Sequence, residues 1–308
     1  TKPASQLSPL LFDLTSLQRE ANSRFGFSAK STLALAQSLY EKHKALTYPR
    51  TDSRHLPEDY VSTVRDTMGS LAQGLTTPEI PSAPPSLGTL AAKTLQNSWV
   101  HPNKRIFNNT KVSDHFAIIP TGQIPKSLSE PEQKLYDLVA RRFLAVFFPA
   151  AEFLETLRIT RVEGEAFKSA GKVLVKAGWL EVYGREVDPD DKETPSLVPI
   201  QPGESVQTSA IDVKQSQTKP PARFTEATLL GAMESAGKLV DDDELREAMA
   251  ERGLGTPATR AAIIEGLISE QYLYRQVREL VPTAKAFSLM VLLNGLGIQD
   301  LTKPELTG

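Results

Sequence analysis

The order of helical and β-forming segments along the chain predicts an α+β fold made of several modules. Three segments rich in β-branched and aromatic residues follow one another in the middle of the chain: Leu154–Val162, Ala166–Val175 and Ser205–Val213. Gly164 separates the first two, and Gly178 and an acidic, proline-bearing loop from Asp188 to Glu204 precede the third. We therefore predict a β-rich module with helical modules on either side.

The flanking regions have the apolar spacing of amphipathic helices. Before the β-rich stretch, residues 27–44 place Leu35 and Leu39 four apart after a serine cap, and residues 132–148 form a second helical stretch that ends at Pro149. After it, Thr225 begins a helix that ends near Gly237. The proline-rich residues 74–89 are predicted to be an extended surface loop or linker.

Composition is that of a globular protein. The 308 residues are 40% hydrophobic and 23% charged, which is enough to bury two or three cores. No apolar run reaches membrane-spanning length and no signal peptide opens the chain, so we expect no membrane partner and a cytoplasmic location. The absence of cysteine excludes disulfides and cysteine-based zinc fingers within the chain.

The sequence gives no metal-binding pattern. The four histidines, His43, His55, His101 and His115, lack a close paired spacing, so we expect no metal site in this chain. The consecutive acids Asp241–Glu244 lie in a polar segment, and we interpret them as a solvated surface.

A tyrosine near a guanidinium is the first candidate for chemistry. Tyr48 and Arg50 flank Pro49, which disfavours the α conformation at Tyr48, so we predict that the preceding helix ends there. A phenol is a weak nucleophile until positive charge stabilises the reacting groups, and the guanidinium of Arg50 can fork onto two phosphate oxygens. Taken alone, the tripeptide is more often only a helix exit.

Two further segments allow a structural or a functional interpretation. Thr256 and Pro257 open a helix whose first turn contains Thr259 and Arg260, and free amides at a helix start can bind phosphate. A simple helix cap explains these residues about equally well. His115 precedes an apolar stretch, where a histidine is more often structural than catalytic.

The charge distribution is uneven although the net charge is only −2. Residues 1–126 carry 14 Lys and Arg against 9 Asp and Glu, whereas residues 127–308 carry 21 against 28. Positive charge therefore gathers around the tyrosine segment. This asymmetry suits local phosphate contacts better than tight association with a duplex. Lys42, Lys44, Arg54, Lys104 and Arg105 are weaker candidates for such contacts.

Five segments in order resemble the type IA DNA topoisomerases, and two of them resemble the topoisomerase III branch in particular. The tyrosine segment Tyr48-Pro49-Arg50-Thr51-Asp52 is similar to the cleavage motif of that family. The other matching segments are the lead-in Leu14–Gln18 with Phe27–Lys30 and Ala36–Glu41, then His115–Thr121, Pro220–Leu229 and Gly253–Ala261. Together they span nearly the whole chain.

The resemblance implies how the chain is divided. Residues 1–14 would be a lead-in from an arch, 15–127 the helical tyrosine-bearing cleavage domain, 128–218 the β-rich arch or hinge module, and 219–308 an incomplete helical domain that binds single-stranded DNA. Family members place a metal-binding TOPRIM domain before this region. We therefore expect a fragment whose complete enzyme binds Mg²⁺ through ligands outside this chain and needs no ATP.

The resemblance also implies roles for residues. Tyr48 would form a 5′-phosphotyrosine link, with Arg50 and His115 as catalytic partners at the phosphate. The residues expected to contact single-stranded DNA are Arg54, Arg223, Thr256, Thr259 and Arg260. A strand would then pass through the break before religation. A bacterial protein of this kind would associate with the nucleoid or a plasmid; no protein partner is predicted.

Two alternatives remain open at the level of sequence. A non-catalytic single-strand-binding or scaffold protein could keep the same fold, and residues preceding Thr1 that contain an Asp-x-Asp strand end would favour the enzyme. A tyrosine recombinase fits less well, because its tyrosine follows a scattered set of basic residues whereas Tyr48 comes early.

Overall fold

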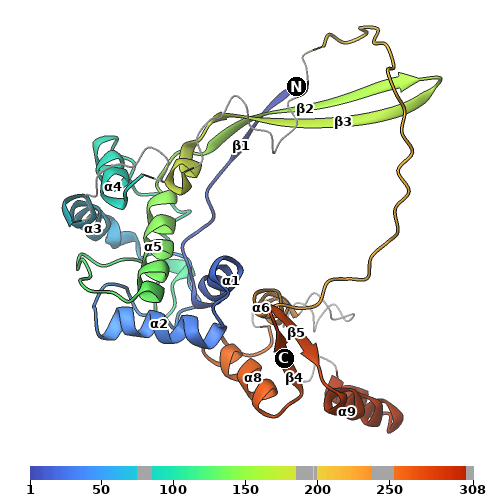
Figure 1. The fold of residues 1–308 in the computed structure, drawn as a ribbon. Coiled ribbons are helices and arrows are strands. Elements are labelled where there is room, and N and C mark those ends of the chain that lie inside the picture. The colour runs from blue at the N-terminus through green and yellow to red at the C-terminus, as the bar shows by residue number, and fades with distance from the viewer. Residues whose placement is uncertain (75–84, 185–196, 198–199, 237–252, 303–308) are drawn as a thin grey trace.

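The computed structural model describes residues 1–74, 85–184, 197, 200–236 and 253–302. Its helices and small sheets form an α+β fold, as predicted (Figure 1). The α-helices are α1 (Leu14–Phe25), α2 (Ala29–Glu41), α3 (Val61–Gly74), α4 (Leu87–Gln96), α5 (Glu130–Ala145), α6 (Glu226–Glu234), α8 (Pro257–Ser269) and α9 (Ala284–Gly295). The short 3₁₀ helices are η1 (Glu58–Tyr60), η2 (Asn109–Lys111), η3 (Gly178–Tyr183) and η5 (Gln299–Thr302). The strands are β1 (Lys2–Gln6), β2 (Ala151–Val162), β3 (Glu165–Lys176), β4 (Leu273–Gln276) and β5 (Glu279–Pro282).

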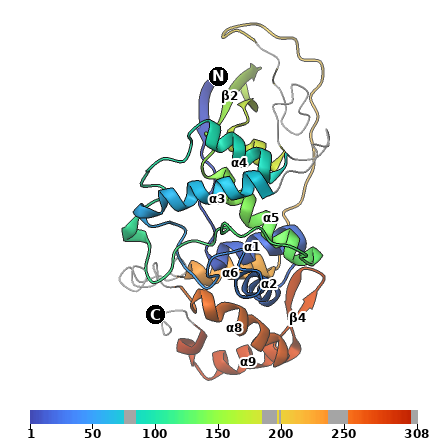
Figure 2. The same cartoon turned by 90° about the vertical axis from the view of Figure 1, so that its left-hand side faces the viewer.

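The main hydrophobic core lies among the five N-terminal helices, which Figure 2 shows from the side of α3 and α4. The predicted helix in residues 27–44 is α2, and Ser28 caps it by accepting a hydrogen bond from the amide of Ser31. The predicted helix in residues 132–148 is α5, which begins two residues earlier because Ser129 and Glu132 form a capping box.

Helix α5 belongs to the core of the tyrosine-bearing module. Its buried face includes Leu135, Tyr136 and Phe143, all fully buried in the same cluster as Leu17 of α1 and Leu39 of α2. The predicted boundary between residues 127 and 128 therefore cuts through one core. Sequence periodicity could locate the helix but not the neighbours against which it packs.

The β-rich module is a three-stranded antiparallel sheet in the order β1-β2-β3. Strand β1 pairs with the first part of β2, from Lys2 opposite Glu155 to Gln6 opposite Ala151. Strands β2 and β3 form a long hairpin with left-handed backbone at Glu163 and Gly164 in its turn. The first two predicted strands are thus confirmed, and the first residues of the chain join the same sheet.

The third predicted strand, Ser205–Val213, is wrong. These residues have no regular secondary structure, and Figure 1 shows residues 200–224 running as an extended segment from the far side of the hairpin back to α6. Val206 and Ile211 are 51% and 60% exposed. This segment lies near the tip of the β2-β3 hairpin, because Val206 and Ile211 line one pocket with Val162 and Phe167, but it forms no ladder with any described strand.

Other predictions are corrected or fall outside the described residues. The predicted 74–89 loop is too long, because Ser86 caps α4 and Leu87 already lies in that helix. Residues 75–84 of the loop lie outside the described part, as do Gly237, the Asp241–Glu244 run and most of the Asp188–Glu204 loop.

The C-terminal module contains α6, α8, the β4-β5 hairpin and α9. Thr225 caps α6 and Thr256 caps α8, as predicted. Just before α8, the left-handed backbone of Gly253 lets its peptide pack against α6, where a Cβ would lie 2.4 Å from the carbonyl oxygen of Met233. Within the part of the chain that the structure describes, no helix combines the length and apolar character needed to cross a membrane.

Candidate functional site

Tyr48 lies on an extended segment that is hydrogen-bonded to the His115–Thr121 segment. Helix α2 ends at Glu41, so the prediction that it continues to Tyr48 is wrong. Instead, the amide of Thr47 donates to Ile119 O at 3.0 Å, and Leu46 forms an antiparallel bridge with Pro120. A stable edge of backbone, rather than a helix end, thus positions the tyrosine.

Two threonines fasten these segments on either side of Tyr48. The hydroxyl of Thr47 donates to Ala117 O at 3.0 Å and accepts from the amide of Ile119 at 2.9 Å. On the other side, the hydroxyl of Thr51 donates to His115 O at 3.2 Å. Two sequence motifs that are about 65 residues apart are therefore held in register at the tyrosine.

The structure brings the rings of Tyr48 and His115 together. Their centroids lie 4.2 Å apart with the planes at 42°, and His115 is exposed whereas Tyr48 is half-buried. Arg50 is also half-buried, and no carboxylate among the described residues pairs with it. The structure thus brings a phenol and an imidazole together. Arg50 follows two residues after Tyr48 in the chain, and the roles expected of Tyr48, Arg50 and His115 stay predictions.

His55 belongs to the segment that follows Arg54. Burial lowers the pKa of His55, and the nearby cations Lys111, Arg54 and Arg105 lower it further. The carbonyl of His55 accepts the amide of Ala117 at 3.0 Å, which ties this region to the His115–Thr121 segment.

Arg54 is engaged in ion pairs in this structure. Its Nε lies 2.5 Å from Asp13 and its Nη2 lies 3.3 Å from Glu234 on α6. Burial disfavours the charged guanidinium, but attraction to Asp13 and Glu234 outweighs this effect and raises the pKa of Arg54. Arg54 thus links the tyrosine segment to the C-terminal module, and its contact with DNA stays a prediction.

Arg260 is a buried link between the two helical modules. It is 3% exposed, and it donates from Nη1 to Thr15 Oγ1 at 2.9 Å and from Nε to Leu254 O at 3.1 Å. The neighbouring amide of Leu14 donates to Thr51 O, so the start of α8 lies close to the tyrosine segment. Burial lowers the pKa of Arg260, whereas Glu234 and Asp13 act in the opposite direction.

The other predicted DNA contacts, Arg223, Thr256 and Thr259, are exposed. Thr256 donates its amide to Thr259 Oγ1 at 2.9 Å, and the amide of Thr259 donates back to Thr256 O. This reciprocal arrangement supports the capping interpretation of these residues, because it uses amides that an anion would need. Their contact with DNA is still a prediction.

The resemblance implies a magnesium ion in the complete enzyme, and the location of its ligands stays a prediction. Among the described residues, no three His, Asp or Glu side chains are grouped closely enough to hold a metal ion. Among the acids near the tyrosine segment, Asp13 caps α1 and binds Arg54.

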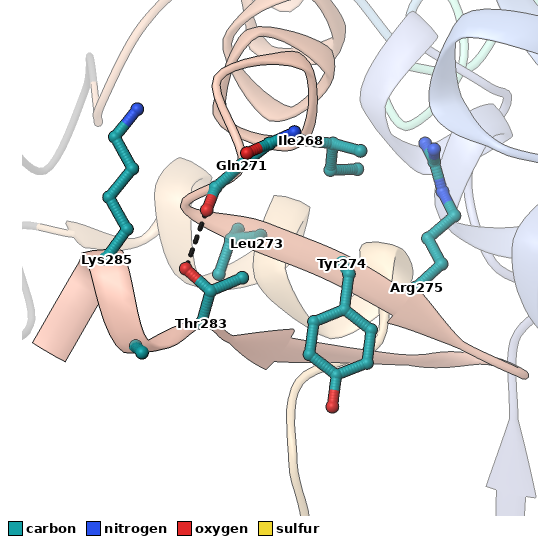
Figure 3. A pocket seen from close by; sticks show the side chains of 8 residues that line it. Ile268, Gln271, Leu273, Tyr274, Arg275, Thr283 and Lys285 are labelled. Carbon is teal, nitrogen blue, oxygen red and sulfur yellow. Dashed lines mark hydrogen bonds between the residues drawn. The ribbon is translucent and has the colours of Figure 1, made fainter.

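A separate pocket lies between the end of α8, strand β4 and the start of α9 (Figure 3). Thr283 Oγ1 donates to Gln271 O at 2.6 Å across it, and Lys285 donates to Glu270 O at 2.6 Å. Tyr274 and Leu273 supply apolar surface. None of the predicted site residues lines this pocket.

Sequence reasoning missed several residues that build the site. Thr47 and Thr51 position the tyrosine, and Asp13 holds Arg54. Tyr40 contacts the ring of Tyr48, with centroids 5.6 Å apart. The sequence offers one usable signal, since hydroxyl-bearing, β-branched residues just before and three positions after Tyr48 suit an extended segment whose side chains hydrogen-bond to a neighbour.

The sequence profile of the family described as DNA topoisomerase matches residues 1–308, so the chain belongs to that family. The solved structure of full-length topoisomerase I from Thermotoga maritima is similar to it, with a TM-score of 0.64 and 25% identity over 96% of this chain and 43% of that one.

Similar curated proteins point to one branch of the family. DNA topoisomerase 3 of Bacillus subtilis strain 168 is 40% identical over 97% of this chain, and DNA topoisomerase 3 of Bacillus anthracis is 42% identical over all of it. The predicted resemblance to type IA topoisomerases of the topoisomerase III branch is thus confirmed. The chain spans only about 40% of the length of these relatives.

Proposed function

We propose that this chain is the strand-cleaving part of a type IA DNA topoisomerase and changes DNA topology as part of a longer enzyme. Family membership over the whole chain supports the class of activity. The observation that carries the proposal is the contact of Tyr48 with His115, 4.2 Å between ring centroids. Arg50, two residues after Tyr48, pairs with no carboxylate among the described residues. All three groups lie on segments fixed by backbone hydrogen bonds.

The proposed reaction is a transesterification. The Tyr48 hydroxyl loses its proton and attacks a backbone phosphorus, and the bond from phosphorus to the 3′ oxygen breaks. The 5′ phosphate stays on Tyr48 and the 3′ oxygen takes up a proton. Arg50 binds the phosphate oxygens as negative charge grows on them, and His115 binds the phosphate or carries the proton.

The reverse attack by the 3′ hydroxyl restores the strand. One phosphodiester is exchanged for another, so the energy of the broken bond is kept and ATP is not required. In the proposed cycle a second strand passes while the ester exists. We propose single-stranded DNA as the substrate, held through its backbone and by stacking with little base specificity, in the cytoplasm of a bacterial cell.

The proposed gate opens at the seam between the tyrosine-bearing and C-terminal helices. Polar contacts dominate this seam: Glu234 pairs with Arg19 and Arg54, and Glu226 accepts the amide of Ala29 at 2.7 Å. Its apolar cluster is small and contains Ala29, Leu230, Met233, Ala261 and Ile264. A mainly polar interface separates and re-forms more easily than a large apolar core. The three-stranded sheet would serve as the arch.

We propose that the magnesium ion of the complete enzyme is bound by residues outside this chain. The expected consequence is that the 308 residues alone neither relax supercoiled DNA nor cleave single strands efficiently. An agarose-gel relaxation assay with magnesium checks this expectation. Robust relaxation by the isolated chain would contradict the proposed division of labour.

The test of the proposed function is the Tyr48→Phe variant of the complete enzyme. We expect no covalent protein–DNA adduct on denaturing gels, with affinity for a single-stranded oligonucleotide close to that of the unaltered protein. Tyr183→Phe is a control, because that half-buried tyrosine of η3 lies outside the site. An adduct that persists in Tyr48→Phe would overturn the proposed nucleophile. Loss of DNA binding with loss of folding would instead favour a structural tyrosine in a non-catalytic protein.

A further inference from the structure

Tyr40, in the last turn of α2, contacts the proposed nucleophile. Its ring centroid lies 5.6 Å from that of Tyr48, and the ring planes are at 80°, which is the edge-to-face arrangement that aromatic pairs favour. Tyr48 therefore has two ring neighbours, Tyr40 and His115. One comes from helix α2 and the other from the His115–Thr121 segment.

Tyr40 is itself held in place by the turn that follows α2. The neighbouring Leu39 is fully buried, and its carbonyl accepts the amide of Ala45 at 2.8 Å. Lys44 has a left-handed backbone with φ of 53°, and Thr121 Oγ1 donates to its carbonyl at 2.6 Å. A non-glycine residue in this conformation persists only where its surroundings hold it, so the turn is rigid.

Lys44 makes a further contact with the ring of Tyr40. Its Nζ lies 5.8 Å from the centroid of the Tyr40 ring, within the range of a cation–π interaction. The Tyr40 hydroxyl, by contrast, has no hydrogen-bond partner in the described part of the chain. The ring, and not the hydroxyl, is therefore the part of Tyr40 that the fold uses.

A half-exposed tyrosine on an extended segment would ordinarily turn among several staggered side-chain conformers. The Thr47 and Thr51 hydrogen bonds fix the backbone beside Tyr48 but do not fix its ring. The phenolic oxygen of Tyr48 can attack phosphorus only when it lies close to the phosphorus and in line with the bond that breaks. Time that the Tyr48 side chain spends in other conformers therefore lowers the rate of cleavage.

We propose that Tyr40 is a positioning residue for strand cleavage, which holds the Tyr48 ring in its attacking conformer by edge-to-face contact. This inference rests on the proposed function. Since an aromatic pair of this geometry changes a conformer ratio by roughly 2- to 10-fold, loss of the ring should slow cleavage by about that factor. DNA binding should change little because Tyr40 is not among the residues expected to contact DNA.

The experiment measures single-turnover cleavage of a labelled single-stranded oligonucleotide by the complete enzyme carrying Tyr40→Leu or Tyr40→Phe. We expect Tyr40→Leu to form the covalent adduct roughly 2- to 10-fold more slowly, with unchanged oligonucleotide affinity. Tyr40→Phe should cleave at the unaltered rate because it keeps the ring. Tyr40→Met, which keeps apolar volume without a ring, should behave like Tyr40→Leu.

Phe27→Leu is the matched control. It removes a ring from the Phe25–Phe27 pair, 5.3 Å between centroids, at the start of α2 and away from Tyr48. We expect a similar loss of thermal stability without slower cleavage. If Phe27→Leu slows cleavage as much as Tyr40→Leu does, general destabilisation is the cause and the inference is overturned.

Two other results would also overturn the inference: an unaltered rate in both Tyr40→Leu and Tyr40→Met, or a Tyr40→Phe variant as slow as Tyr40→Leu. The proposed function is tested separately by Tyr48→Phe. A covalent adduct in Tyr48→Phe would refute the proposal that Tyr48 is the nucleophile. If Tyr48 forms its adduct normally and the Tyr40 variants cleave at the unaltered rate, only the positioning role of Tyr40 is refuted.

Discussion

The Thr47 hydroxyl provides the sharpest test of how the tyrosine segment is held. It donates to Ala117 O at 3.0 Å and accepts from the amide of Ile119 at 2.9 Å, and both partner residues are buried. Thr47→Val replaces this hydroxyl by a methyl group of similar size. The substitution therefore removes two hydrogen bonds while it leaves the packing volume and the β propensity of the segment nearly unchanged.

The expected cost follows from the two bonds. Losing a typical hydrogen bond costs about 1 kcal/mol, and a buried amide left without a partner costs about 1–3 kcal/mol. We expect the free energy of unfolding to fall by about 2–4 kcal/mol. For a chain of 308 residues the midpoint of thermal unfolding would fall by roughly 3–6 °C. Thr47→Ser, which keeps the hydroxyl, should recover most of this loss.

Circular dichroism during heating measures the midpoint, and hydrogen exchange measures the protection of the Ile119 amide. Thr63→Val, an exposed substitution in α3, is the control and should shift the midpoint little. A Thr47→Val midpoint within about 1 °C of Thr63→Val, with Ile119 still protected, would refute the inference that this hydroxyl fastens the two segments.

Three further predictions concern stability. Hydrogen bonds from Ser129 and Ser38 lower the pKa of the Glu132 carboxyl to about 2, so its stabilisation is complete above pH 4.5 and is lost as the pH falls through 2. Glu132→Gln should cost about 1–3 kcal/mol at pH 7 in urea unfolding, and the difference should shrink toward pH 2; a pH-independent difference would contradict this cause. Tyr136→Phe should raise the free energy of unfolding by about 1 kcal/mol, because burial raises the pKa of Tyr136 and its hydroxyl has no partner within the described residues; a clear loss of stability would point to an unseen partner. Gly253→Ala should destabilise the chain by more than 1 kcal/mol, because the added Cβ would lie 2.4 Å from Met233 O and the backbone of Gly253 is left-handed. The control is Gly266→Ala in α8, where the Cβ would enter open space and the effect should be neutral or stabilising. Equal effects of the two substitutions would refute the steric argument.

The sequence predicted correctly the helix starts and strands that depend on residues close together in the chain. The serine cap of α2 and the Thr256-Pro257 start of α8 follow from residues a few positions apart, and both are confirmed. The segments Leu154–Val162 and Ala166–Val175 formed strands because each has the other as a partner across a tight turn. Ser205–Val213 has similar composition but no partner, and composition alone cannot reveal this difference.

The site divides in the same way. Tyr48, Arg50 and His115 could be found because their chemistry and motif spacing are visible in the sequence, and the structure places the Tyr48 and His115 rings in contact. The roles of Thr47, Tyr40 and Asp13 depend on contacts between distant segments, which periodicity does not encode. Arg260 shows the converse, since a residue that looked available for phosphate is buried against Thr15.

The most direct measurement for the proposed chemistry is the identity of the residue that carries DNA. The complete enzyme is trapped on a single-stranded oligonucleotide, digested with protease and nuclease, and its peptides are mapped by mass spectrometry. We expect the nucleotide remnant on the peptide that contains Tyr48, joined through the phenolic oxygen to a 5′ phosphate. A remnant on any other side chain, or one joined through a 3′ phosphate, would contradict the proposed function.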